Sequence, residues 1–354
     1  MSFQAIPIVD VGPALGGPTS PPDAAFAQEF TDICHHVGFA VITNHGIAKA
    51  HTDAVFDIMH RFFALDEADK RRIDKNNSPQ MRGWEPVGAE TTDNQPDMRE
   101  QIDVWTERPL VDPSADAPPY HRLYGPNQWL SNDVLPGHRE VSLSWINALA
   151  GLADRLMSAL AIGLDLAPNH FEQLFGDDTM SLAKFIHYPP TPAGAAGVNP
   201  HHDAAFLTVL APGPTPGLQV QNQAGDWIDV SVIPDSFVIN LGEMIQSMTG
   251  NYLVATPHRV VTSDERYSAG YFHGPSLDTS LAPLDLDPKF AAAVDASAHH
   301  RSAGFMPTPA EADAGTAAMA SEHRPTTYGE QLWNYFHRSY PEQMQRHHGS
   351  TMVS

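Results

Sequence analysis

From about residue 181 onward, the apolar residues change from helical spacing to the spacing of short strands, and this change limits the possible folds most strongly. Short β-like runs follow one another, divided by turn residues, without a helical pattern between them. Evenly spaced short strands of this kind predict an antiparallel sandwich or barrel. The expected strands are 181–188, 206–210, 217–220, 227–230, 237–241, 253–261 and 268–272.

The first part of the chain has the pattern of helices. Phe26, Phe30, Ile33 and Val37 fall on one helical stripe, and Gly38 is placed to end that helix. Helices that precede a run of strands predict an α+β chain, in which helices buttress a β core within one cooperative unit. Further expected elements are strands at 6–10, 39–43 and 101–105, helices near 55–63, 140–163 and 328–340, and loops at 75–135, 189–200 and 274–326.

Composition excludes several classes of partner. The chain has 20 Lys+Arg against 42 Asp+Glu, a net charge of −22, which repels nucleic acid and anionic membranes. We find neither a basic leader nor a long uninterrupted apolar run, so we expect a cytoplasmic protein without a membrane partner. Its single cysteine, Cys34, rules out an intrachain disulfide. A metal site in this chain must therefore use histidine and carboxylate ligands.

One His-x-Asp pair has the context of a metal site. The 19 histidines and 42 acidic residues predict about two His-x-Asp/Glu triplets by chance, and the chain has four. Only His201 and Asp203 precede a β-like run, where residues two apart share one side of a strand. His258, 55 residues beyond Asp203, is the best third ligand. Two histidines and one carboxylate suit an oxygen-activating non-haem Fe(II) site.

An anion receptor follows the third histidine. Arg266 lies eight residues beyond His258, and Ser268 shares its side of the expected strand. A guanidinium beside a hydroxyl is suited to binding a carboxylate. In so acidic a chain, a dianionic co-substrate needs such local positive charge. Iron at one end and Arg266 at the other would supply it.

These features, taken in order along most of the chain, resemble the isopenicillin N synthase-like branch of the Fe(II)/2-oxoglutarate-dependent dioxygenases. The motifs that carry the resemblance are Ile-Pro-Ile-Val-Asp, Val-Gly-Phe-Ala-Val-Ile-Thr-Asn-His-Gly-Ile, Arg-Gly-Trp-Glu-Pro-Val-Gly-Ala-Glu, His-Tyr-Pro-Pro, His-x-Asp, Gly-Leu-Gln-Val, Asn-Leu-Gly-Glu, His-Arg-Val and Arg-Tyr-Ser. The stretch 248–260 and Tyr-Gly-Glu at 328–330 also look like bacterial ethylene-forming enzyme.

The resemblance implies a fold and a division of the chain. The fold would be a distorted double-stranded β-helix (jelly roll) buttressed by helices. A helical and mixed region over 1–175 would precede the Fe(II)/2-oxoglutarate jelly-roll core over 176–285. A C-terminal loop and helix over 286–354 would then pack on the core.

The resemblance also implies roles for single residues. His201, Asp203 and His258 would hold the iron, and Arg266 with Ser268 would bind the far carboxylate of 2-oxoglutarate. Tyr188 and Lys184, on the same face of one strand, would contact this co-substrate. Candidate substrate contacts are Arg82, Trp84, Arg99, Phe206, Phe272 and Trp333.

The implied activity is oxidation of an unactivated C–H bond in an amino acid or specialised metabolite, with O2 consumed and succinate and CO2 released. The outcome would be hydroxylation, desaturation or cyclisation, in a monomer or homodimer. Three alternatives stay open: a 2-oxoglutarate-independent iron oxidase of the same fold, ethylene-forming breakdown of 2-oxoglutarate, and a non-enzymatic jelly-roll binding module.

Overall fold

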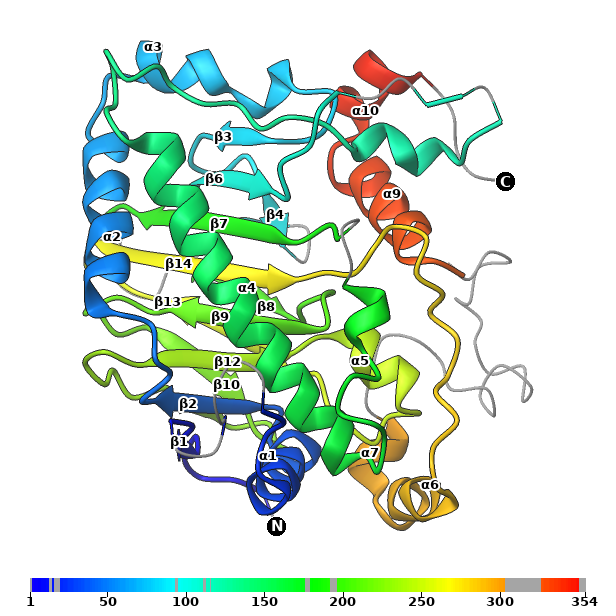
Figure 1. The fold of residues 1–354 in the computed structure, drawn as a ribbon. Helices are drawn as coiled ribbons and strands as arrows, with labels where there is room; N and C mark the ends of the chain where they lie inside the picture. The colour runs from blue at the N-terminus through cyan, green and yellow to red at the C-terminus, as the bar shows by residue number, and fades with distance from the viewer. Residues whose placement is uncertain are drawn as a thin grey trace.

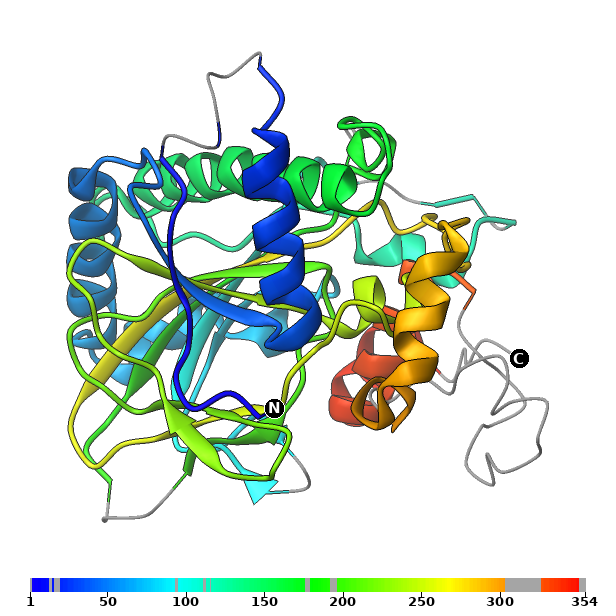
Figure 2. The same ribbon diagram turned by 90° about the horizontal axis from the view of Figure 1, so that it is seen from below.

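The computed structural model describes residues 2–12, 15, 20–92, 95–110, 113–114, 116–175, 179–191, 196–302 and 326–349. Two β-sheets form its centre, and helices cover the outer face of the larger one (Figure 1). Figure 2, seen from below, shows helices α1 and α4 on one side of the strands and the smaller sheet on the other. The chain is thus α+β, with a layered β centre.

The large sheet has eight strands and is antiparallel except where its edge strand β1 pairs in parallel with β2. Its order is β1 (Ile8–Asp10), β2 (Phe39–Thr43), β12 (Phe237–Leu241), β9 (Leu207–Ala211), β14 (Arg266–His273), β7 (Leu182–Tyr188), β6 (Glu100–Trp105) and β3 (Gly83–Glu85). The small sheet has the order β11 (Trp227–Asp229), β10 (Leu218–Gln221), β13 (His258–Val261) and β8 (Ala196–His201). A separate hairpin pairs β4 (Thr91–Thr92) with β5 (Gln95–Pro96).

Alternation along the strands of the large sheet sends side chains into two separate cores. Phe185 and Val209 belong to the main core beneath the helices. Ile186 and Tyr188 belong to a second core, where they pack with Val198 of the small sheet. Polar side chains that share the second face lie between the two sheets, and they are the candidates for a functional site.

Helix α1 illustrates how local sequence sets the elements. The Asp23 carboxylate caps its first turn by accepting from the backbone N–H groups of Ala25 and Phe26. Gly38, at φ +68°, lies just beyond its end in the left-handed conformation. The helices are α1 (Ala24–His36), α2 (Lys49–Phe63), α3 (Glu67–Lys70), α4 (His138–Gly163), α5 (Glu243–Met248), α6 (Pro288–Ala296), α7 (Ala298–Ser302), α9 (Tyr328–Ser339) and α10 (Pro341–His348), and the short 3₁₀ helices are η1 (Arg71–Ile73), η2 (Lys75–Asn77), η3 (Pro119–Leu123) and η4 (Glu172–Leu174).

Helix α4 is long and apolar enough to cross a membrane by length and composition alone, and half of its most apolar window is buried inside the fold. It crosses the outer face of the large sheet (Figure 1). Its buried stripe includes Trp145, Leu149 and Leu156. At Gly163, a Cβ would collide with Thr31 of α1, so the two helices approach closely there. This is the packing of a core helix.

Three expectations about elements are wrong. The segment 189–200 is not all loop, because β8 begins at Ala196 and pairs with β13. The segment 274–326 contains α6 and α7 among its described residues. The strand expected over 253–261 begins only at His258, since Pro257 has no N–H to give to a ladder.

Candidate metal centre and anion receptor

Two neighbouring strands of the small sheet bring three potential ligands together. His201 is the last residue of β8 and His258 the first of β13, and the two face each other directly in the antiparallel pair. Asp203 follows two residues after His201. Its Oδ1 lies 3.7 Å from His201 Nε2 and 3.6 Å from His258 Nε2. One ligand atom from each residue lies within 4.8 Å of the other two, a spacing that fits one bound ion.

The backbone fixes which nitrogen each histidine presents. His201 Nδ1 lies 2.9 Å from the carbonyl oxygen of Asn199, and His258 Nδ1 lies 3.2 Å from that of Thr256. A carbonyl only accepts, so each Nδ1 carries the proton and each Nε2 keeps its lone pair for a metal. Burial, with the nearby His258, lowers the pKa of His201 to about 3. His201 is therefore neutral at physiological pH, as a ligand must be.

Two side chains of the large sheet hold the Asp203 carboxylate. Its Oδ2 accepts from Thr208 Oγ1 of β9 at 2.6 Å and from Asn240 Nδ2 of β12 at 2.7 Å. Burial alone would raise the pKa of Asp203, but His258, His201 and these two hydrogen bonds hold it below its ordinary value. The carboxylate is thus ionised, with Oδ2 occupied and Oδ1 directed to the histidines.

Arg266 and Ser268 lie together between the sheets. Arg266 is 1 % exposed, and its Nη1 donates to Ser268 Oγ at 3.0 Å. The Tyr188 side chain, opposite Arg266 in the β7–β14 pair, places its ring centroid 5.0 Å from the guanidinium carbon. Burial lowers the pKa of Arg266, and among the described residues no carboxylate forms an ion pair with it. A buried cation without a counter-charge is a receptor for an anion.

Three more expected site residues lie on or beside the face between the sheets. Lys184 Nζ donates to both carboxylate oxygens of Glu90, at 3.0 and 2.9 Å. Arg99 Nη2 donates to Glu90 Oε2 at 2.7 Å and to Asp97 Oδ2 at 3.1 Å. Phe272 shares the face of β14 that carries Arg266, because an even number of residues separates them.

Arg82 and Trp84, two expected substrate contacts from the Arg-Gly-Trp-Glu motif, point away from the space between the sheets. Arg82 is fully buried and donates to the carbonyl oxygens of Gly125 and Leu123, so it fixes a loop. Trp84 Nε1 donates to Glu100 Oε2 at 2.9 Å, on the helix-covered face of the large sheet. Neither side chain lies between the sheets.

Two other expected substrate contacts belong to the main core. Phe206 packs edge-on against Phe171 and Phe175, with ring centroids 6.5 and 5.4 Å away. Trp333 is fully buried on α9 and packs against His337, at 5.2 Å between rings. Both side chains are buried within the main core.

The sequence expectations omitted several polar residues of the site. Asn240 is the first residue of the Asn-Leu-Gly-Glu motif, and the motif by itself predicts no role for it. Glu85 and Glu90 lie in the same motif as Arg82 and Trp84. Gln101 and Asp103 alternate with apolar residues in a strand buried along its whole length, and this is a signal that points to a polar interior face.

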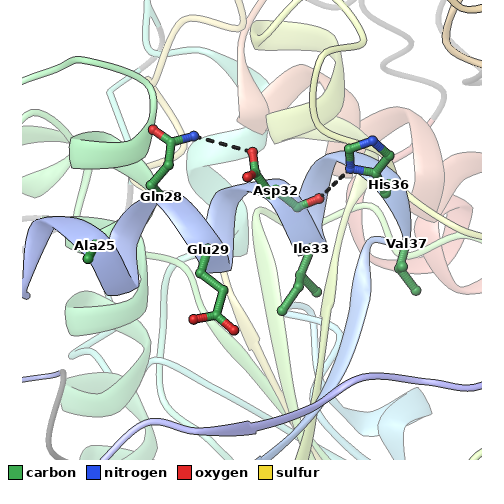
Figure 3. Close-up of a pocket in the computed structure, with 7 residues that line it drawn as sticks. All are labelled: Ala25, Gln28, Glu29, Asp32, Ile33, His36 and Val37. Atoms are coloured by element: carbon green, nitrogen blue, oxygen red, sulfur yellow. Dashed lines mark hydrogen bonds between the residues drawn. The ribbon is translucent and has the colours of Figure 1, made fainter.

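An open groove of about 600 Å³ runs along α1, outside this centre (Figure 3). Within it, Gln28 bonds to Asp32, and the His36 ring bonds to the Asp32 carbonyl oxygen. None of the expected site residues lines it, so we give it no part in the chemistry. Its lining residues are Ala25, Gln28, Glu29, Asp32, Ile33, His36 and Val37.

Two family models match the chain in sequence. The N-terminal model, described as non-haem dioxygenase in morphine synthesis, matches residues 6–132. The 2OG-Fe(II) oxygenase superfamily model matches residues 177–275. The second match spans the three clustered ligands as well as Arg266 and Ser268.

Similar proteins of known class extend over most of the chain. The 2-oxoglutarate-dependent dioxygenase frbJ of Dothideomycetidae sp. (strain 11243) is 32% identical over 296 residues, 81% of this chain and 78% of that protein. Homoarginine-6-hydroxylase 2-ODD-C23 of Glycine max is 29% identical, over 80% of this chain and 89% of that protein. In fold, the chain is similar to a Caulobacter crescentus protein assigned to the 2OG-Fe(II) oxygenase family, with a TM-score of 0.72 and 24% identity over 95% of this chain and 99% of that one. The chain therefore belongs to the Fe(II)/2-oxoglutarate-dependent dioxygenases, non-haem enzymes that use Fe(II), 2-oxoglutarate and O2.

Proposed function

We propose that this dioxygenase oxidises an unactivated C–H bond of a small molecule, an amino acid or a specialised metabolite, and releases succinate and CO2. The observation that carries the proposal is that three ligand atoms and one buried arginine, for which the described residues offer no acidic partner, lie between the same two sheets. The arrangement fits a keto diacid whose keto-acid end binds the metal and whose far carboxylate binds the arginine. We further propose that the paired sheets form a double-stranded β-helix.

The proposed ligands are His201, Asp203 and His258, and their donor set fits Fe(II). Two neutral imidazoles present Nε2, and one ionised carboxylate presents Oδ1. Three protein ligands leave coordination positions free for co-substrate and oxygen. Bound Fe(II) with 2-oxoglutarate supplies the oxidant that removes hydrogen from the substrate, while 2-oxoglutarate becomes succinate and CO2.

The protein's own part is to bind, orient and exclude water. Arg266 and Ser268 would hold the far carboxylate of 2-oxoglutarate, with Tyr188 packed against the guanidinium. The second core, to which Ile186 and Val198 contribute, makes the surroundings apolar. Low polarity strengthens the ion pair with Arg266 and limits side reactions of the oxidant.

For the primary substrate we retain Arg99, Lys184 and Phe272 as candidate contacts, because these three lie on the face between the sheets. The resemblance implies that Lys184 contacts the co-substrate. Because its ammonium group donates to the Glu90 carboxylate, we propose it instead as a contact of the primary substrate. A relative named as a homoarginine-6-hydroxylase supports an amino-acid substrate. We also propose a cytoplasmic monomer or homodimer without nucleic-acid or membrane partners, and the division at 1–175, 176–285 and 286–354.

An anaerobic titration tests the proposal. Fe(II)-loaded protein is titrated with 2-oxoglutarate, and the visible charge-transfer absorption of the chelated keto acid is followed. We expect a saturable band, and a Kd raised by about tenfold or more in Arg266→Ala, because a buried charged hydrogen-bonding partner is lost.

Arg259→Ala is the matched control. Arg259 lies on the neighbouring strand β13, where its Nε donates to Gln219 and its guanidinium stacks on Trp227. We expect this variant to bind 2-oxoglutarate like the parent protein. Iron binding without the absorption band would refute the co-substrate roles and favour the oxidase alternative. Ethylene in the headspace of an aerobic reaction would indicate breakdown of 2-oxoglutarate itself.

A further inference from the structure

A buried set of charged side chains lies beside the candidate metal centre. Some are on the face of β3, β6 and β7 that looks toward the small sheet, and others come from η2 and the segments next to these strands. We call this set, together with Gln101, the polar wall. Register places Glu85 opposite Gln101 and Asp103 opposite Lys184. Its carboxylates are Glu85, Glu90, Asp97 and Asp103. Its cations are Lys75, Arg99 and Lys184.

Carboxyl groups outnumber cations in the polar wall as the structure describes it. Lys75 Nζ lies 2.8 Å from Glu85 and 2.7 Å from Asp103, while Lys184 and Arg99 both pair with Glu90. Among the described residues, four carboxylates therefore share three cations, so the carboxylates outnumber the cations by one. Burial, only partly offset by Lys75, raises the pKa of Glu85, as expected for a carboxylate that lacks a full counter-charge.

Two acceptor atoms in the polar wall have no donor within the part of the chain that the structure describes. Gln101 Nε2 donates to Glu85 and Glu90 at 2.8 Å each, so its amide lies among the carboxylates, and its Oε1 has no hydrogen-bond partner. Asp103 Oδ1 also lacks one, since the nearest ammonium, of Lys184, is 3.8 Å away. Gln101 is 1 % and Asp103 3 % exposed. Among the described residues, Arg99 Nε is an unpaired donor in the same set, whereas Glu90 and Glu85 also accept from Tyr335 and Tyr340. The two free acceptors are suited to the N–H groups of a cation.

The polar wall adjoins the ligands of the metal centre. Asp97 Oδ1 accepts from the backbone N–H of Asn199 at 3.3 Å, and the Asn199 carbonyl oxygen accepts from His201 Nδ1. Lys184 shares one strand face with Tyr188, which contacts Arg266. A molecule bound at the polar wall would therefore lie next to the iron and its co-substrate.

We propose that the polar wall binds the cationic group of the primary substrate, a guanidinium or a primary ammonium, and so positions the rest of that molecule at the metal centre. This inference rests on the proposed function. It assigns specificity to Gln101 and Asp103, whose free acceptors receive the N–H groups. The excess of carboxyl groups over cations adds to this, because a cation bound there favours their ionised form. Anionic molecules such as 2-oxoglutarate are directed instead to Arg266.

Equilibrium binding to the anaerobic Fe(II)- and 2-oxoglutarate-loaded protein tests the inference. The probes are L-arginine, its neutral isostere L-citrulline, and agmatine, which keeps the guanidinium but lacks the α-carboxylate. We expect L-arginine to bind and L-citrulline to bind about ten- to hundredfold more weakly, because a charged donor is lost. Equal binding of agmatine and L-arginine would identify a polyamine-like substrate, and preference for L-arginine would identify an amino acid. L-Citrulline binding as tightly as L-arginine would overturn the inference.

Matched variants separate the polar wall from the rest of the site. Asp103→Asn is expected to weaken L-arginine binding about tenfold or more. Its control is Glu100→Gln, which removes an equally buried carboxylate from the same strand but from the opposite face, where Glu100 pairs with Lys70. Gln101→Met removes the free acceptor together with the hydrogen bonds that its amide donates to Glu85 and Glu90, and it serves if Asp103→Asn does not fold.

The readouts keep this inference apart from the proposed function. The 2-oxoglutarate absorption band is recorded in the same samples. If L-arginine binds and Asp103→Asn or Gln101→Met weakens it while the band is absent, the polar wall is supported and the co-substrate assignment fails. If the band forms and no cationic probe binds, or both variants bind L-arginine like the parent, the inference is overturned.

Discussion

The hydrogen bond from Asn240 to Asp203 makes a sharp prediction about metal affinity. Asn240 Nδ2 lies 2.7 Å from Asp203 Oδ2, and both residues are buried. Asn240→Leu keeps the side-chain volume and removes the donor, so Asp203 keeps only Thr208 at 2.6 Å. Loss of a buried hydrogen bond to a charged acceptor costs about 1.5–3 kcal/mol. We therefore expect the Kd for Fe(II) to rise about 10- to 100-fold.

The Asn240→Leu substitution should also change the pH dependence of metal binding in a defined direction. Hydrogen bonds from Asn240 and Thr208 favour the ionised form and contribute to the lowered pKa of Asp203. Affinity that depends on an ionised carboxylate is present above its pKa and lost as pH falls through it. Without Asn240 the pKa of Asp203 rises, so the acid limit of metal binding moves to higher pH.

Anaerobic Fe(II) titration over a pH series, repeated with Mn(II), measures both effects. Asn127→Leu is the control, because Asn127 is also buried and bonds the Trp105 backbone at 3.0 and 2.8 Å, away from the metal centre. It should lose stability without losing metal affinity. A folded Asn240→Leu variant whose Kd stays within about twofold of the parent would refute the reasoning, since the expected free-energy change exceeds that ratio.

Three further predictions concern buried titratable groups. Lys75→Met leaves the carboxylates of Glu85 and Asp103 without their shared cation, so urea denaturation at neutral pH should show a loss of about 3–5 kcal/mol; a loss below about 1 kcal/mol would contradict this. Burial lowers the pKa of His138 from its ordinary 6.5 to about 4. Between about pH 6.5 and pH 4, this histidine is protonated in the unfolded chain but not in the folded chain. The free energy of unfolding should therefore fall by about 1.4 kcal/mol for each pH unit as the pH falls through this range. His138→Gln should remove that contribution from a denaturation series over this window, and an unchanged slope would count against it. Burial raises the pKa of the Cys34 thiol, so iodoacetamide should label it only after unfolding, as mass spectrometry will show; rapid labelling of the native chain would show that the thiol is accessible.

The parts of the centre that follow from strand periodicity were predictable from sequence. Arg266 and Ser268 lie two residues apart in β14 and share one face of it, as the sequence predicts. His201 ends β8 and Asp203 lies two residues beyond it, so this pair was found by the strand pattern although only His201 lies in the strand. The strand order, by contrast, brings Asn240 of β12 beside Asp203 across 37 residues. Local pattern carries no information about such pairings.

The substrate contacts show where motif reading fails. A motif identifies a segment, but adjacent residues of a strand face opposite sides. In β3, Trp84 faces the helices while its neighbour Glu85 faces the small sheet. The C-terminal loop expectation failed for a different reason. Asp287 and Pro288 are a helix N-cap and first-turn pair whose signal was available, and α6 begins there.

The positions of the three metal ligands imply that the bound ion also has a structural effect. His201 and His258 belong to the small sheet, whereas Asp203 is anchored by β9 and β12 of the large sheet. An ion held by all three ligands therefore links the two sheets directly, and it closes a chain loop of 55 residues between Asp203 and His258. Metal binding then also stabilises the packing of the two sheets against each other. A chelator that removes the iron would weaken the contact between the sheets first.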